Sequence, residues 1–315
     1  MIKRETSAEY DARRRSDWIS PSDIKGLRVP MDFVVKRRKP VEHKDIFDIG
    51  TAVHTAILEP EEFAKTVTYF PEEKFPDQKN KTLDGACKLT PQNKEALAEF
   101  QQQNKQKIVL RESYWNEIAE MVLSYQSNWG ATRLLSPKKG LIEHSFYTRY
   151  VFQRNGDLDR IEGAPMDAKR DSNLIMLVRT KADYVHQKDR PFAADVKTAV
   201  SVDPREFSRS AARLEYDIQA AMVCDIVSAN MGEYYESFIF VAIEKTPPYY
   251  VAMYDVNYTD IKDAHNKYIK RLNQIRKGFN SKKFPGFEYL ADNDWGLLPL
   301  DLPAWYKKYQ NESKF

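Results

Sequence analysis

Two apolar runs in the middle of the chain predict a pair of neighbouring strands. The run Leu174–Val185 is rich in aliphatic residues, and the shorter run Pro191–Thr198 follows after a polar segment. A polar segment that ends in proline, placed between two apolar runs, predicts a turn. Side chains alternate across a strand, so Asp195 and Lys197 share one face of the second strand. Adjacent strands would bring Asp183, near the end of the first run, next to this pair.

Helix and strand signals continue on both sides of these strands. Amphipathic spacing or a helix-start signal predicts helices at 31–39, 44–59, 91–128 (mostly), 203–229 with a break before 214, and 260–279. The tetrapeptide Ser20–Asp23 predicts a further helix start, with Ser20 or Ser22 as N-cap. Strands are predicted at 140–152, 236–243 and 249–254, the last two as a hairpin at a sheet edge. Irregular structure is expected at 1–18, 70–90 and 153–173.

His54 lies beside the apolar stripe of the predicted helix 44–59, one turn after Gly50. Glycine inside a helix costs about 1 kcal/mol relative to alanine, so we expect Gly50 to permit the close approach of another segment. From this pattern alone, His54 is either a hydrogen-bonded core histidine or a ligand, and both interpretations remain open.

Composition limits the classes of protein that this chain can represent. The 315 residues are 42% hydrophobic and 30% charged, and mean hydropathy is −0.64. No apolar run approaches the ~20 residues of a membrane span, and no apolar signal region follows the N-terminus. Cys87 and Cys224 are the two cysteines, so neither a disulfide framework nor a zinc site is expected. We therefore expect a cytoplasmic protein. By its length the chain could form one large domain or two small ones, and because no repeat or linker marks a boundary we expect a single domain.

The charge of the chain is mildly basic, with a net charge of +3. Basic residues cluster at 13–15 and 36–39. Arg205, Arg209 and Arg213 are spaced by four and would share a face of one continuous helix, which suits phosphate contacts. A solvated arginine face is the alternative, and the pattern does not separate the two.

Asp183, Asp195 and Lys197 together suit metal-dependent hydrolysis of a phosphodiester. Two carboxylates can hold Mg²⁺, which prefers oxygen ligands and lowers the pKa of a bound water. A neighbouring lysine can orient that water or stabilise charge in the transition state. The alternative is a surface Asp–Lys pair, because Asp-x-Lys is frequent by chance. Carboxylates this close repel each other, so we expect strain without metal.

The chain resembles the PD-(D/E)xK nuclease superfamily, and within it the RecE-type (exodeoxyribonuclease VIII-like) phage recombination nucleases. The resemblance runs from about Ile19 to Tyr309. It is carried by Ser20–Ser22, Asp48–Phe63 with its Gly-Thr-Ala-x-His core, Asp183, Asp195-Val-Lys197-Thr, Tyr216–Gln219 and Leu302–Trp305. It implies an α/β fold, a central mixed sheet flanked by helices. The chain departs from the pattern at Ala182, where the superfamily has proline, and at Val223, where related nucleases often have tyrosine.

The resemblance also implies a role for each matching residue. Asp183 and Asp195 would bind the metal, His54 would complete or flank that site, and Lys197 would be the catalytic lysine. Further catalytic-site residues would be Glu143, Gln219 and Tyr216. Candidate DNA contacts are Arg205, Arg209, Arg213, Ser20 and Ser22.

The activity implied by the resemblance is Mg²⁺-dependent degradation of linear double-stranded DNA in the 5′ to 3′ direction, leaving 3′ overhangs for strand annealing. Mn²⁺ is expected to substitute for Mg²⁺. The expected partners are a RecT-like single-strand annealing protein and further copies of the chain in a ring, in a bacterial or phage-infected cytoplasm. Two alternatives remain: another DNA nuclease of the superfamily (an endonuclease or a single-strand-specific enzyme), or a catalytically idle DNA-binding protein.

Overall fold

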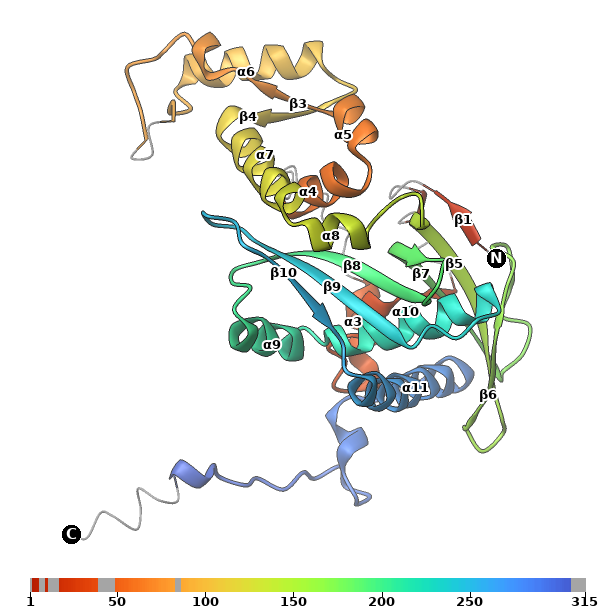
Figure 1. Ribbon diagram of the computed structural model, residues 1–315. Coiled ribbons are helices and arrows are strands. Elements are labelled where there is room, and N and C mark those ends of the chain that lie inside the picture. The colour runs from red at the N-terminus through yellow and green to blue at the C-terminus, as the bar shows by residue number, and fades with distance from the viewer. Residues whose placement is uncertain (1, 6–8, 11–16, 39–48, 83–85, 307–315) are drawn as a thin grey trace, which may run out of the picture.

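A mixed β-sheet forms the centre of the protein (Figure 1). The computed structural model describes residues 2–5, 9–10, 17–38, 49–82 and 86–306. In this part of the chain the sheet has eight strands in the order β1-β5-β7-β8-β9-β10, with β6 paired to β5 and β2 to β7. The strands are β1 (Ile2–Arg4), β2 (Trp18–Ile19), β5 (Gly140–Phe152), β6 (Leu158–Gly163), β7 (Ile175–His186), β8 (Phe192–Ala199), β9 (Ser237–Glu244) and β10 (Val251–Asp255). The predicted α/β class with a central mixed sheet is confirmed.

The pairing of the central strands changes abruptly between β7 and β8. β5 and β7 form a long antiparallel pair that runs from Gly140 opposite His186 to Val151 opposite Ile175. β7 and β8, in contrast, are paired only through two residues of each strand, ending at Tyr184 opposite Ala194. β8 then pairs in parallel with β9 over its full length. The sheet therefore forks between β7 and β8.

Helices cover both faces of the sheet (Figure 1). The helices of the main body are α2 (Pro21–Ile24), α3 (Pro30–Arg38), α4 (Ile49–Leu58), α7 (Glu112–Ser127), α8 (Trp129–Leu134), α9 (Pro204–Arg213), α10 (Tyr216–Met231) and α11 (Tyr258–Ser281). One face packs against α10, with α2, α3 and α11 outside it, and the other packs against α4 and α7. The predicted start of helix 44–59 lies outside the described residues.

The spacing of Leu214, Ile218, Met222 and Ile226 in the sequence predicts a buried stripe on α10, which is correct for three residues and wrong for one. Ile218, Met222 and Ile226 are fully buried, but Leu214 is 46% exposed. The chain breaks after α9, as predicted, and Leu214 lies in that break rather than on the helix. Its side chain therefore does not follow the helical period.

A smaller lobe lies between α4 and α7 in the chain (Figure 1). It contains α5 (Pro60–Thr66), β3 (Val67–Phe70), η1 (Glu72–Lys74), α6 (Pro91–Gln103) and β4 (Ile108–Arg111), with β3 and β4 paired in parallel. Phe70, Phe75 and Cys87 form its buried centre. In its described residues the segment 70–90 is largely irregular, as predicted, apart from η1, and 91–128 is mostly helical, as predicted, with β4 between α6 and α7. The parallel pair of β3 and β4 was not predicted, because four-residue strands carry little periodic signal.

Two further segments predicted to be irregular contribute short strands. β1 in the segment 1–18 pairs with β5, where Ile2 lies opposite Phe146. β6 in the segment 153–173 forms a hairpin with the other end of β5. Each is an added edge strand whose formation depends on a long partner, β5, rather than on its own sequence pattern.

The sequence argued against a disulfide framework and against a membrane span, and the cysteines and helices of the structure relate to these two points. Cys87 and Cys224 are both free and buried, as expected for a chain without a disulfide framework. No helix in the described ranges combines the length and the apolar character that crossing a membrane requires.

Glu215 joins three elements at the break between α9 and α10. Its backbone is left-handed, with φ 50°. Arg271 of α11 donates to both carboxylate oxygens at 2.6 and 2.9 Å, Lys267 lies 2.8 Å away, and the amide of Gly26 donates as well. Burial opposes ionisation, but these partners outweigh it and lower the pKa of Glu215 to about 2.

We expect the Glu215→Gln variant to be less stable at pH 7 by about 1–3 kcal/mol, because the charged hydrogen bonds to Arg271 and Lys267 are lost. The pKa of Glu215 in the folded protein is lower than its ordinary value near 4.5, so the ionised carboxylate stabilises the fold above pH 4.5. This stabilisation is lost as the pH falls toward 2. Urea unfolding should therefore show a difference from wild type that shrinks between pH 5 and pH 2. Glu206→Gln, which removes an exposed pair with Arg209, is the control and should change stability little. A pH-independent difference for Glu215→Gln would contradict the prediction.

Candidate metal centre and active site

The fork between β7 and β8 holds the polar residues that the sequence placed together. Asp183 lies on β7 just beyond the last pair with β8, and its Oδ2 accepts a 2.8 Å hydrogen bond from the amide of Val196. A side-chain carboxylate thus replaces a main-chain partner in the sheet. Asp195 and Lys197 flank Val196 on β8. The predicted juxtaposition of Asp183, Asp195 and Lys197 on adjacent strands is confirmed.

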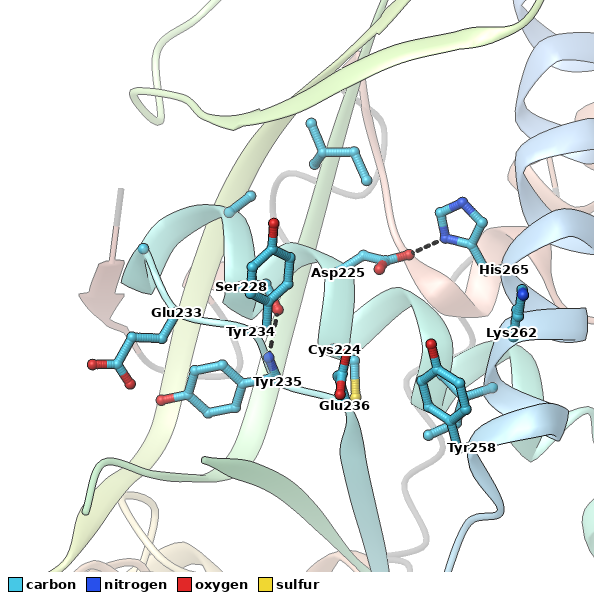
Figure 2. Close-up of a pocket in the computed structure, with 14 residues that line it drawn as sticks. Cys224, Asp225, Ser228, Glu233, Tyr234, Tyr235, Glu236, Tyr258, Lys262 and His265 are labelled. Atoms are coloured by element: carbon cyan, nitrogen blue, oxygen red, sulfur yellow. Dashed lines mark hydrogen bonds and ion pairs between the residues drawn. The ribbon is translucent and has the colours of Figure 1, made fainter. Parts of the chain in front are cut away.

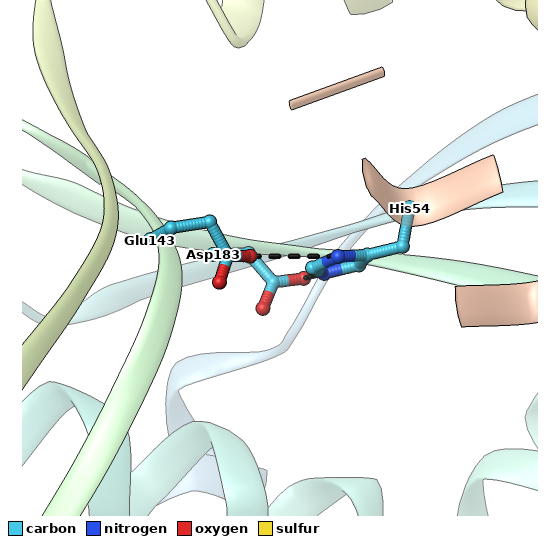
Figure 3. A group of neighbouring side chains, drawn as sticks. All are labelled: His54, Glu143 and Asp183. Carbon is cyan, nitrogen blue, oxygen red and sulfur yellow. Dashed lines mark ion pairs between the residues drawn. The ribbon is translucent and has the colours of Figure 1, made fainter. Parts of the chain in front are cut away.

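Three side chains from three elements converge at this fork (Figure 3). Nε2 of His54 on α4 lies 2.6 Å from Oδ2 of Asp183, and Nδ1 lies 3.4 Å from Oε1 of Glu143 on β5. One donor atom from each of the three lies within 4.8 Å of the others. An imidazole nitrogen and two carboxylate oxygens are ligands for divalent cations. His54 is therefore a member of a polar cluster rather than a histidine of the apolar core.

Glu143 is held in an unusual backbone conformation. Its φ is 55°, in the left-handed region that costs a residue other than glycine about 1–3 kcal/mol. The pairs on either side, Ile142 with Tyr184 and His144 with Ala182, keep the register of β5 and β7. Buried Oε1 of Glu143 has no hydrogen-bond partner among the described residues, although His54 is near. A buried carboxylate oxygen of this kind is suited to bind a cation.

Each carboxylate of the site has a cationic partner. Lys181 pairs with Glu143, and Lys197 pairs with Asp195 at 2.6 Å. Together with the pair between His54 and Asp183, three cations therefore face three carboxylates. These ion pairs offset the repulsion that we expect between the carboxylates without metal. The periodicity of the sequence could not reveal the pairs.

The pKa values follow from this pairing. Burial opposes protonation of His54, but Asp183 and then Glu143 outweigh it and raise the pKa of His54 to about 9. Burial lowers the pKa of Lys197, and the carboxylates of Asp195 and Asp183 more than compensate and raise it. His54 and Lys197 are thus both cations at neutral pH, and metal binding at His54 requires loss of its proton.

Asp195 is held from the side of α10. Nε2 of Gln219 donates to Oδ1 of Asp195 at 2.6 Å, while Oδ2 faces Lys197. The ring of Tyr216, one turn before Gln219, lies 5.4 Å from the ammonium of Lys197. An aromatic face attracts a cation, so Tyr216 supports Lys197. The structure brings Gln219 and Tyr216 to the site but leaves Asp195 outside the three-residue donor group of His54, Glu143 and Asp183.

The residues suggested for DNA contact lie on α9 and at the start of α2 and are not members of this cluster. Arg205, Arg209 and Arg213 are exposed on the single helix α9, so they share a solvent face. Ser20 is buried and caps α2, with its hydroxyl bonded to Asp23 and Ser22. Its hydroxyl is thus already used within the protein. A DNA contact by any of these residues stays a prediction.

Sequence reasoning missed two lysines of the site. Lys181 precedes Asp183 by two residues on β7, so strand alternation places both on one face, and this signal was available. Lys25 follows α2 and reaches Gln219 at 3.0 Å. Burial, and then the charge of Lys197, lowers the pKa of Lys25 to about 8. No local pattern marks Lys25, because its neighbours at the site are distant in the chain.

The site lines a cavity of about 430 Å³ that also includes Gly50 and Thr51 of α4. Gly50 thus borders the site, in line with the close approach expected there. A larger cavity of about 570 Å³ lies between α10 and α11 (Figure 2), where Asp225 pairs with His265 at 2.6 Å. Within the described ranges, its walls hold no group of three metal-donor atoms. The candidate metal donors His54, Glu143 and Asp183 therefore line the smaller cavity.

We expect Mg²⁺ to raise the melting temperature of the protein relative to a chelator. A cation that binds the folded state alone stabilises it by about 2.7 kcal/mol at a concentration of 100 times Kd. Thermal unfolding with MgCl₂ and with EDTA measures this difference, which should vanish in Asp183→Asn. Equal melting temperatures for wild type in both conditions would contradict a metal centre.

Comparisons with known proteins agree with this architecture. Residues 174–289 match the family model of the "PDDEXK-like domain of unknown function (DUF3799)", a stretch that includes Asp183, Asp195 and Lys197. This stretch of the chain is thus similar to a PDDEXK-like domain, and His54 and Glu143 lie outside the matched residues. A search of the curated proteins finds no match to the chain.

Solved structures extend the comparison to the whole chain. The crystal structure of a "Putative exonuclease" from Eubacterium rectale is similar with a TM-score of 0.53 and 14% identity, and 98% of each chain is covered. At this identity the likeness shows the fold. A second structure, SSO0001, has a TM-score of 0.26 and 15% identity over 59% of this chain and 75% of its own.

Proposed function

We propose that this protein is a metal-dependent nuclease that degrades linear double-stranded DNA from its ends. The observation that carries the proposal is the fork of a PDDEXK-like sheet, where His54, Glu143 and Asp183 meet beside Asp195 and Lys197. Carboxylates, an imidazole and an ammonium in one cavity are the groups that phosphodiester hydrolysis requires.

The donor set fits a divalent cation. His54, Glu143 and Asp183 would hold it, and Asp195 would complete the set, as the resemblance implies. Two or three carboxylates favour Mg²⁺, and the imidazole is compatible with Mn²⁺ as well. The bound ion would supply a water of lowered pKa and neutralise charge on the phosphate. The orphan Oε1 of Glu143 supports this assignment.

Lys197 acts as a cation in the proposed reaction. Its raised pKa keeps the ammonium protonated, so it donates hydrogen bonds and does not remove protons. Asp195 on one side and the ring of Tyr216 on the other hold the ammonium in place. A fixed donor of this kind stabilises the negative charge that develops on the phosphate oxygens.

DNA would be bound by surfaces next to the cavity. α9 follows β8 directly, and its three exposed arginines extend from the end of the strand that carries Lys197. Ser22, exposed at the start of α2, is a second candidate. Salt should weaken binding in proportion to the number of phosphates contacted.

The 5′ to 3′ direction, the 3′ overhangs and the role in recombination rest on the resemblance to RecE-type nucleases. So do the ring of identical subunits, a RecT-like annealing partner and the cytoplasmic location. The description of the similar Eubacterium rectale protein as an exonuclease supports end-dependent cleavage.

An exposed apolar segment supports the proposal of a protein partner. Ten large apolar side chains in residues 287–306 are exposed, among them Trp295 at 86% and Leu300 at 88%. Residues 284–306 also hold four carboxylates and no lysine or arginine. Exposed apolar surface of this extent is typical of interaction sites. A second copy or an annealing protein would cover it.

The proposal is tested by a gel assay with Mg²⁺ on linear duplex DNA labelled at the 5′ or the 3′ end. A closed circular duplex and the Lys197→Met enzyme serve as controls. We expect early release of the 5′ label, an intact circle and no cleavage by the variant. Cleavage of the circle would indicate an endonuclease. No cleavage of any DNA, even with Mn²⁺, would favour a DNA-binding protein without activity.

A further inference from the structure

Lys25 is hydrogen-bonded to the active site through the side chain of Gln219. Its Nζ donates to Oε1 of Gln219 at 3.0 Å, and Nε2 of Gln219 donates to Oδ1 of Asp195 at 2.6 Å. Oδ2 of Asp195 in turn faces Nζ of Lys197 at 2.6 Å. A chain of hydrogen bonds therefore runs from the end of α2 to the lysine proposed to act on the phosphate.

The backbone that carries Lys25 is firmly placed. Ile24, just before it, is fully buried. Ser20 and Asp23 form a capping box that fixes the start of α2. Lys36 of α3 donates to the carbonyl oxygens of Ser22, at 3.2 Å, and of Lys25. An anchored backbone lets the side chain of Lys25 impose an orientation on its partner.

Lys25 and Asp195 leave the amide of Gln219 a single orientation. An ammonium has donors only, and an ionised carboxylate has acceptors only. The amide oxygen must therefore face Lys25, and the amide nitrogen must face Asp195. A flipped amide would place its oxygen against the carboxylate and its NH₂ against the ammonium. Both contacts would then be repulsive.

The ring of Tyr216 lets this arrangement hold two cations close to each other. The ammonium of Lys25 lies 5.5 Å from the ring centroid, and that of Lys197 lies 5.4 Å from it. A π-face attracts each ammonium, which offsets their mutual repulsion. Tyr216 therefore connects the two lysines directly, while Gln219 and Asp195 connect them through hydrogen bonds.

We propose that Lys25 is a positioning residue of this site: it fixes the amide of Gln219, and through that amide it orients the carboxylate of Asp195 toward Lys197 and the metal ligands. The inference rests on the proposed nuclease function. It assigns Lys25 no contact with the reacting phosphate. Removal of the ammonium should leave Gln219 free to rotate, so that Asp195 loses a defined orientation.

A double-mutant cycle tests the inference, with Lys25→Met, Gln219→Met and the double variant. Lys25→Arg tests rescue by another cation, and Lys262→Met, an exposed lysine on α11, is the control. Each protein is examined by isothermal titration with Mn²⁺ in the absence of DNA, by thermal unfolding, and by kcat and KM on linear duplex DNA.

We expect Lys25→Met to weaken Mn²⁺ binding and to lower kcat, each by about 10-fold, as is typical when support of a metal ligand is removed. KM for DNA and the melting temperature should change little. In the Gln219→Met background, Lys25→Met should have almost no further effect, because both substitutions break the same chain. Lys25→Arg should recover most of the loss, and Lys262→Met should match wild type.

Three results would overturn the inference. A higher KM for DNA with unchanged kcat and unchanged Mn²⁺ affinity would make Lys25 a DNA contact. Additive losses in the double variant would show that Lys25 does not act through Gln219. Unchanged kcat, KM and Mn²⁺ affinity in Lys25→Met would show that Lys25 has no role at this site. If wild type itself cuts no DNA, the proposed function fails, but the Mn²⁺ titrations still test whether Lys25 and Gln219 are coupled.

Discussion

Replacing Asp183 with asparagine is expected to reduce DNA cleavage on the order of 10³-fold or more, which corresponds to about 4 kcal/mol of transition-state stabilisation. Oδ2 of Asp183 contacts both Nε2 of His54 and the amide of Val196. Asparagine keeps the shape and can still accept from Val196, but it lacks the charge that a metal centre needs. Initial rates on linear duplex DNA and titration with Mn²⁺ measure the two losses.

Asp225→Asn is a matched control for this substitution. Asp225 pairs with His265 at 2.6 Å, the same separation as between Asp183 and His54, but in the other cavity. The same chemical change there should leave cleavage and Mn²⁺ binding intact, whatever its effect on stability. Full activity of Asp183→Asn would show that Asp183 is not a ligand of the catalytic metal, and it would refute the proposed mechanism.

Lys197→Met is expected to lower kcat by about 10²–10³-fold, the range typical for loss of one fixed donor to a developing negative charge. Methionine retains much of the length of the side chain over Tyr216 but has no ammonium. Because Lys197 is not among the metal donors, Mn²⁺ affinity should stay close to that of wild type. A lower kcat with unchanged Mn²⁺ affinity would thus distinguish the role of Lys197 from that of Asp183, because Asp183→Asn is expected to lower both.

The exposed Lys245, in the turn between β9 and β10, provides the control substitution Lys245→Met. It should leave kcat unchanged. If Lys197→Met lowered Mn²⁺ affinity as much as Asp183→Asn does, its effect on kcat would come from a rearrangement of the carboxylate side chains of the site. A direct role in stabilising the phosphate would then be excluded.

Strong local patterns explain why much of the main body could be predicted. β5 was predicted at 140–152, the range that the structure shows, because β-branched and aromatic residues fill it. The break between α9 and α10 followed from a helix-start signal and a second periodic run. The β3–β4 pair of the small lobe was missed because each strand is four residues long and its partner lies in a distant segment of the chain.

The sequence by itself determined the strand that holds Asp195 and Lys197, the neighbouring strand that holds Asp183, and the helix that holds His54, because alternation and helical spacing are local properties. The tertiary structure alone decided how these groups are paired. The fork of the sheet, the left-handed backbone of Glu143 and the reach of Lys25 to Gln219 all join residues from distant segments. Contacts of this kind depend on how the layers pack, and no periodic pattern along a single chain encodes them.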